Sequence, residues 1–139
     1  MKNIERIIEE QGFYASTVVG ISMYPMLRNR RDTVIISPVD GRLKKYDIPL
    51  YRRGDAYVLH RIVRVLPESY IICGDNCMEL EYGITDEQII GVLTGFYRDD
   101  KMADINGFLY GIYVRGWCFL YPIRRLGKRI RLAVRKKGV

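Results

Sequence analysis

The chain contains one histidine and three cysteines, and both scarcities exclude classes of protein. Three cysteines cannot form a complete set of disulfides, and free thiols indicate a reducing compartment. Cys73 and Cys77 have a spacing that zinc fingers do not use, and a single imidazole offers little to complete a metal site. We therefore expect a protein that works without a metal or another cofactor.

Long hydrophobic runs are also missing from the amino-terminal part of the chain. Residues 1–10 carry charges throughout, so we expect neither a signal peptide nor a membrane anchor there. Ile4, Ile7 and Ile8 recur at helical spacing before Gly12, which predicts a short amphipathic helix packed on the domain. These features favour a cytoplasmic protein or one bound peripherally to the cytoplasmic face of a membrane.

Acidic residues are absent from residues 124–139, although eight basic residues lie there. The whole chain has 23 basic and 16 acidic residues and a net charge of +7. Without those eight, 15 basic residues face 16 acidic ones, so the excess positive charge belongs to a tail. A nucleic-acid-binding domain is therefore the less favoured interpretation.

The segment before this tail is apolar and aromatic but does not predict a membrane span. Residues 107–123 contain Arg115 and three glycines, whereas a span needs about 20 apolar residues. An arginine near the centre costs roughly 2.5–3.5 kcal/mol. We expect residues 107–139 to form an amphipathic helical segment on an anionic membrane surface; the alternative is a helix docked on the protein's own sheet.

Between these two ends the pattern is that of short strands. β-Branched and apolar runs recur with turn residues between them, and the Pro67-Glu68 connection suggests a hairpin. This predicts a mainly β domain of antiparallel sheets over residues 1–104, followed by the segment 105–139. The expected strands are Thr17–Ile21, Thr33–Ser37, Tyr46–Arg52, Ala56–Leu66, Ser69–Cys73 and Gln88–Tyr97.

One serine stands in a setting that suits a nucleophile. Ser22 lies between an expected strand and Pro25, which stiffens the backbone, and Gly20 permits close backbone approach. A serine hydroxyl needs a base to take its proton. Lysine is absent between Lys45 and Lys101, so His60 is the base that the core strands can offer. Each residue alone also fits a structural role, as a turn serine or a strand histidine.

Two acids follow that can orient the imidazole. Asp75 lies in a Gly-Asp-Asn loop at the end of the strand expected to pair with that of His60. A carboxylate there would select the tautomer and stabilise the imidazolium. Glu81 is the second candidate, and the loop taken alone is also an ordinary turn.

Together these motifs resemble the type I signal peptidase superfamily, which also includes self-cleaving SOS-type repressors. The resemblance rests on Gly-x-Ser-Met-x-Pro-x-Leu from Gly20, then His-Arg-Ile-Val from His60, then the Gly-Asp-Asn loop. A histidine followed by arginine is similar to the endoplasmic-reticulum and archaeal branch. The resemblance implies a fold of coiled antiparallel sheets and peptide-bond cleavage. It implies these roles: Ser22 as nucleophile, His60 as base, Asp75 or Glu81 as orienting acid, and Gly20, Met23 and Pro25 against the substrate.

The sequence therefore predicts a serine endopeptidase that cleaves a signal-peptide-like or leader-peptide substrate through an acyl-enzyme. The alternative is a non-catalytic peptide-binding β module with a membrane- or nucleic-acid-binding tail. A repressor is disfavoured, because the short segment before Ser22 cannot hold a helix-turn-helix domain.

Overall fold

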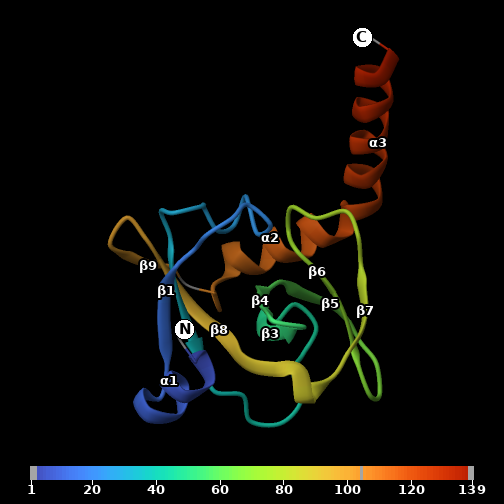
Figure 1. Ribbon diagram of the computed structural model, residues 1–139. Coiled ribbons are helices and arrows are strands. Elements are labelled where there is room, and N and C mark those ends of the chain that lie inside the picture. Colours follow the sequence, from blue (N-terminus) through green and yellow to red (C-terminus); the bar gives the residue numbers. More distant parts are fainter. Residues whose placement is uncertain (1–2, 104, 138–139) are drawn as a thin grey trace. The chain divides into compact units, whose positions relative to one another are not determined.

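The computed structural model describes residues 3–103 and 105–137, with side chains to residue 134. The chain forms two compact units, Met1–Ile105 and Asn106–Val139. The first is built mainly from antiparallel strands with a short helix at its start, and two helices follow in the second (Figure 1). The prediction of a mainly β fold with helices at both ends is confirmed. Among the described residues, no helix combines the length and apolarity that crossing a membrane requires.

The amino-terminal helix α1 (Ile4–Gln11) begins and ends where the sequence predicts. The Asn3 side chain accepts a hydrogen bond from the Arg6 backbone N–H and so caps the first turn. Gly12 has a positive φ of 82° and donates its N–H to the Ile8 carbonyl, which ends the helix. Ile4 and Ile8 are buried, so the predicted apolar face is the packed one.

The larger sheet has six strands in the order β1-β2-β8-β3-β4, and β9 pairs with β8. All its described pairings are antiparallel. The long strand β8 crosses the sheet and curves, and the strands drawn in green curl beside it (Figure 1). The strands are β1 (Tyr14–Thr17), β2 (Thr33–Ser37), β3 (Pro49–Arg53), β4 (Ala56–Leu59), β8 (Ile89–Arg98) and β9 (Lys101–Ala103).

The smaller sheet has three antiparallel strands, β5 (Arg61–Val65), β6 (Tyr70–Cys73) and β7 (Glu81–Ile84). The expected hairpin at Pro67-Glu68 is confirmed, because β5 and β6 pair across it. The strands β7 and β9 were not predicted. Strand β7 is short and contains Gly83, a poor strand former. Its pairing with β6, and not its own composition, therefore determines that it is a strand.

Three strand predictions are wrong in their bounds, and the strand expected from Tyr46 begins only at Pro49. The run expected as one strand over 56–66 breaks at His60 into β4 and β5, which belong to different sheets. His60 is therefore at the crossing between the sheets and not on one face of a continuous strand. The first strand ends at Thr17 rather than Ile21, because the following residues turn into a loop.

The core lies inside the curl of both sheets. Strand β3 runs between β8 and β4, and Pro49 is tolerated there as its first residue beside a bulge. The buried residues enclosed by the strands include two tyrosines, so part of this core is polar: they are Leu43, Tyr51, Val58, Ile62, Tyr70, Ile72 and Ile84. One of these tyrosines, Tyr51, contacts His60.

The second unit contains two helices, α2 (Phe108–Phe119) and α3 (Tyr121–Lys137). Both begin without an acidic residue in the first turn. Arg124 on α3 donates a hydrogen bond to the Trp117 carbonyl at 3.0 Å and lies over the indole ring at 4.1 Å. The two helices are thus joined by a polar and a cation–π contact.

Candidate active site

Ser22 lies in a loop between β1 and β2 that its own hydrogen bonds hold in place. The Gly20 N–H donates to the Asn29 side chain at 2.8 Å, and the Leu27 N–H donates to the Met23 carbonyl at 2.9 Å. Gly20 has a positive φ of 102°, a conformation that favours glycine. The predicted stiff loop around a half-buried serine is therefore present.

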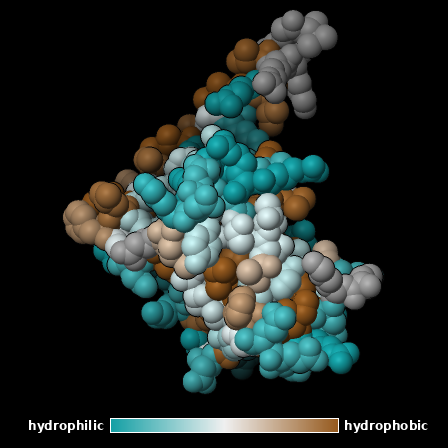
Figure 2. All heavy atoms as spheres, turned by 90° about the vertical axis from the view of Figure 1, so that its left-hand side faces the viewer, coloured by the Kyte–Doolittle hydropathy of each residue, from teal (hydrophilic) through white to brown (hydrophobic). Residues whose placement is uncertain are grey.

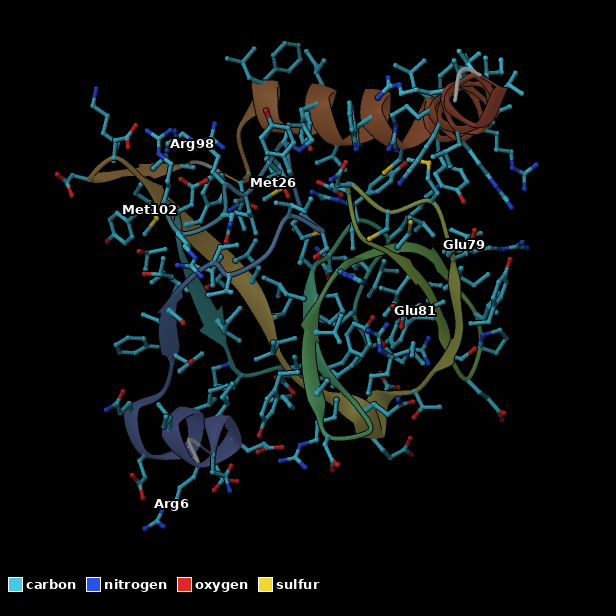
Figure 3. All side chains as sticks on the ribbon, turned by 45° about the horizontal axis from the view of Figure 1, so that its top comes forward. Arg6, Met26, Glu79, Glu81, Arg98 and Met102 are labelled. Atoms are coloured by element: carbon cyan, nitrogen blue, oxygen red, sulfur yellow. The ribbon has the colours of Figure 1, made fainter. Side chains whose placement is uncertain are left out.

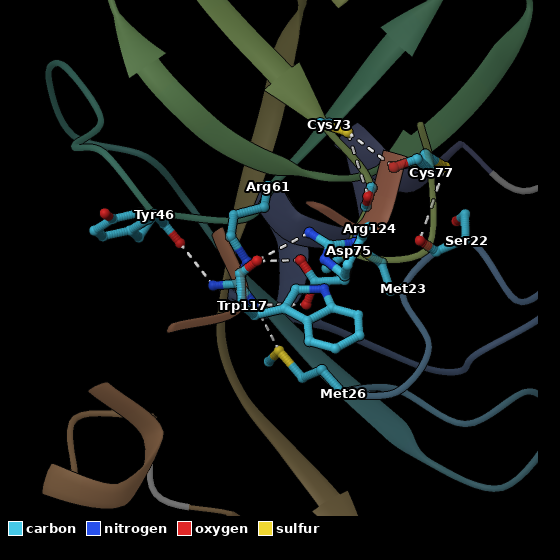
Figure 4. Close-up of polar contacts among 11 residues, drawn as sticks. Ser22, Met23, Met26, Tyr46, Arg61, Cys73, Asp75, Cys77, Trp117 and Arg124 are labelled. Carbon is cyan, nitrogen blue, oxygen red and sulfur yellow. Dashed lines mark hydrogen bonds and ion pairs between the residues drawn. The ribbon is translucent and has the colours of Figure 1, made fainter. Parts of the chain in front are cut away.

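This loop docks on the Gly-Asp-Asn loop, which brings two of the three motifs into contact. The Asn76 N–H donates to the Ser22 carbonyl at 2.8 Å, and the Asp75 N–H lies 3.3 Å from the Met23 sulfur. The close-up in Figure 4 shows Ser22 and Met23 beside Asp75 and Cys77. Both contacts are made by backbone N–H groups of the Gly-Asp-Asn loop, so the path of that loop sets the position of Ser22.

Gly74 lies between the Ser22 backbone and the His60 ring. A Cβ atom at this residue would lie 2.7 Å from the Ser22 carbonyl oxygen and 3.0 Å from Cδ2 of His60. Contacts below 3.0 Å are not tolerated, so the close approach of these groups requires glycine here. The sequence placed Gly74 in a turn; the structure gives it a packing reason.

The Nδ1 side of the His60 ring faces a carboxylate. Its Nδ1 atom lies 3.3 Å from Glu81 Oε1 and 3.4 Å from the Tyr51 hydroxyl. The Cδ2 atom, which is bonded to Nε2, faces Gly74 and the serine loop. Because Nδ1 faces the acid, Nε2 is the ring nitrogen left to accept a proton.

Glu81 is itself held by two donors. Arg53 donates to Oε1 at 2.6 Å, and the Tyr51 hydroxyl donates to Oε2 at 2.9 Å. Figure 3 shows Glu81 among the side chains enclosed by the green strands. A carboxylate held at both oxygens keeps one orientation toward the imidazole. Tyr51 and Arg53 belong to the candidate site through these contacts and were not predicted; their alternation along one strand was the available signal.

The electrostatics favour a neutral imidazole. Burial lowers the pKa of His60 below its usual value, Arg53 lowers it further, and the attraction and hydrogen bond of Glu81 oppose these effects. Burial and the hydrogen bond to Glu81 raise the pKa of Tyr51 far above its usual range, so the phenol remains a donor. A buried neutral histidine beside an acid is a competent general base at neutral pH.

The second predicted acid makes a different contact. Asp75 receives two hydrogen bonds from Arg61, at 2.8 and 3.0 Å, in a fork-to-fork ion pair. Arg61 also donates to the Tyr46 carbonyl at 3.1 Å and contacts the Met26 sulfur (Figure 4). The structure therefore brings Glu81, rather than Asp75, to the imidazole and uses Asp75 to tie the loops together.

The residues expected against a substrate differ in their accessibility. Gly20 is exposed and Pro25 half-buried, whereas Met23 is buried and packs under the loop. Three apolar side chains near Ser22 are exposed and were not singled out in the sequence: Val19, Ile21 and Tyr24. The surface beside the serine is therefore apolar.

The fold and the site define a small mainly β protein with a serine, a histidine and a carboxylate gathered where its two sheets meet. No protein-family model matches the chain, and comparison with curated proteins gives no match either. The resemblance to the signal peptidase superfamily thus stays a prediction, and the functional argument rests on the geometry of this site.

Replacing Glu81 by glutamine tests the role of the orienting acid. Because Glu81 raises the pKa of His60, its loss leaves burial and Arg53 to lower that pKa further. If the neutral imidazole is the base of a reaction at this site, the acid limb of the pH–rate profile should lie below about pH 6.5 in the wild type and move lower still in Glu81→Gln.

The same variant should lose up to about 10⁴-fold in kcat, because the tautomer is no longer selected. Glu79→Gln is the matched control, since Glu79 is exposed and two residues away. An unchanged rate and pH profile in Glu81→Gln would show that the acid has no part in the reaction.

Proposed function

We propose that the protein is a serine endopeptidase in which Ser22 is the nucleophile, His60 the general base and Glu81 the acid that orients it. One observation carries the proposal: the Ser22 backbone carbonyl and Cδ2 of His60 both lie beside Gly74, while Nδ1 of the same ring contacts Glu81. Serine acyl transfer requires a nucleophile, a base that can take its proton, and a third group that orients the base.

In this mechanism Ser22 Oγ attacks the carbonyl carbon of a peptide bond while His60 Nε2 takes the hydroxyl proton. The imidazolium, stabilised by Glu81, then gives this proton to the leaving amine as the C–N bond breaks. Water next attacks the ester carbonyl and passes a proton to His60. The imidazolium returns this proton to Ser22 Oγ as the ester C–O bond breaks and the acid is released. Backbone N–H groups, that of Ser22 among them, would hold the oxyanion, since Gly20 offers no side chain.

The proposed substrate is a peptide in extended conformation with apolar side chains, as in a leader or signal peptide. The exposed apolar residues Val19, Ile21 and Tyr24 flank Ser22 and offer a surface for such side chains. An extended peptide satisfies its own backbone by pairing with protein backbone, so its recognition depends little on side-chain charge.

Covalent labelling tests this function without knowledge of the substrate. A fluorophosphonate probe is expected to add one probe mass to the intact protein, and peptide mapping should place it on Ser22. The label should disappear in Ser22→Ala and fall strongly in His60→Gln, because the hydroxyl is reactive only beside a base. A folded protein that takes no label would favour the alternative, a non-catalytic peptide-binding module.

A further inference from the structure

The helix α3 has two chemically different faces. Large apolar side chains recur three or four residues apart and are all exposed: Ile123, Leu126, Ile130 and Val134. This spacing places them along one stripe of the helix. The described part of the chain covers none of these side chains, although exposing such a stripe to water is unfavourable.

The rest of the helix surface is basic. Four exposed or half-buried basic residues with described side chains lie outside the stripe and outside the contact with Trp117: Arg125, Lys128, Arg129 and Arg131. The sequence of α3 contains no acidic residue, so nothing within the helix neutralises them. In Figure 2 brown apolar and teal hydrophilic side chains both line the segment that leads to the grey carboxyl-terminal atoms. Leu132 is the exception, an exposed apolar residue on the basic side of the helix.

The helix α2 adds to the apolar surface of this unit. Its exposed large side chains are Phe108, Leu109, Ile112 and Phe119. Because Arg124 joins α2 to α3 through Trp117, these residues belong to the same unit as the α3 stripe. Apolar side chains are thus exposed along both helices.

We propose that α3 lies in the plane of an anionic lipid bilayer, with its apolar stripe in the acyl region and its basic residues at the headgroups. An apolar stripe beside a basic face that no acidic residue of the helix neutralises is complementary to such a surface in both hydrophobicity and charge. A nucleic acid would pair with the charges but leave the stripe exposed, and an apolar partner protein would leave the charges unused. This inference does not depend on the peptidase activity.

Vesicle co-sedimentation of the full chain tests the proposal. The protein should sediment with vesicles of phosphatidylcholine containing phosphatidylglycerol and stay in solution with phosphatidylcholine alone. Ile130→Gln should weaken the partition coefficient by about tenfold, because one inserted side chain is lost. Leu132→Gln is the matched control on the same helix and should change it less than about twofold. Raising the salt to 0.5 M should weaken binding, since headgroup attraction is screened.

The control variant distinguishes insertion of the apolar stripe from nonspecific hydrophobic adsorption. Equal losses in Ile130→Gln and Leu132→Gln would overturn the proposal, and so would the absence of any binding to anionic vesicles. Tight binding of a DNA duplex that Ile130→Gln leaves unchanged, with no vesicle binding, would assign the basic face to nucleic acid instead. Ile130 is exposed, so circular dichroism and the melting temperature should be the same in both variants.

Discussion

Replacing Ser22 by alanine or His60 by glutamine is expected to lower peptide hydrolysis by about 10⁴-fold or more. Alanine removes the attacking oxygen, and glutamine cannot accept the serine proton at neutral pH. Cleavage of a fluorogenic peptide library, followed for the best substrate as kcat/KM, measures both losses. The double variant should be no worse than either single one, because the two residues act in one step.

The matched controls for this experiment are the lysines nearest to the site in sequence. Lys44→Ala and Lys45→Ala should retain wild-type rates, since the imidazole and not an amine is the base. Lys44 and Lys45 lie in the connection between β2 and β3, outside the contacts that join Ser22, Gly74 and His60. Loss of activity in a lysine variant, with His60→Gln active, would contradict the assigned base.

Breaking the Arg61–Asp75 ion pair is expected to lower the free energy of unfolding by about 3–5 kcal/mol. Only 1% of the Arg61 side chain and 2% of that of Asp75 are exposed, so replacing either one removes an oppositely charged partner from a buried charge. Asp75→Asn and Arg61→Met, compared with the wild type in urea-induced unfolding, give the two values. Activity should also fall, because Asp75 is in the loop that holds Ser22.

An exposed ion pair of the same chain supplies the control. Arg6 and Glu10 on α1 form a salt bridge at 2.9 Å with 74% and 61% of their side chains exposed. Arg6→Met should change the free energy of unfolding by less than about 1 kcal/mol, because solvent screens this pair. A similarly small change in Asp75→Asn would show that the buried pair does not hold the loops together.

Much of the fold was readable because its signals are local. The helix before Gly12 follows from three isoleucines at helical spacing and a glycine that ends it. The hairpin at Pro67-Glu68 follows from two apolar runs and a short turn. The break at His60 was not readable, since apolar and β-branched residues lie on both sides of it in the run from Ala56 to Leu66. Only the pairing of its two halves with different sheets divides it.

The candidate site divides in the same way. The sequence by itself singled out Ser22, His60 and the Gly-Asp-Asn loop, because each has a residue type with its own chemistry in a short motif. It left the orienting acid open between Asp75 and Glu81. The distance of either carboxylate from the imidazole depends on strand pairing, which no local pattern specifies.

Tertiary structure decided that choice. The pairing of β7 with β6 sets Glu81 opposite Ile72, from where its carboxylate contacts both His60 and Tyr51. Asp75, which is closer in sequence to the end of β6, instead forms an ion pair with Arg61. The sequence thus determined which chemical groups the protein has and in what order. The folding of two sheets around His60 determined which of them touch, because a buried charge must find its partner in three dimensions.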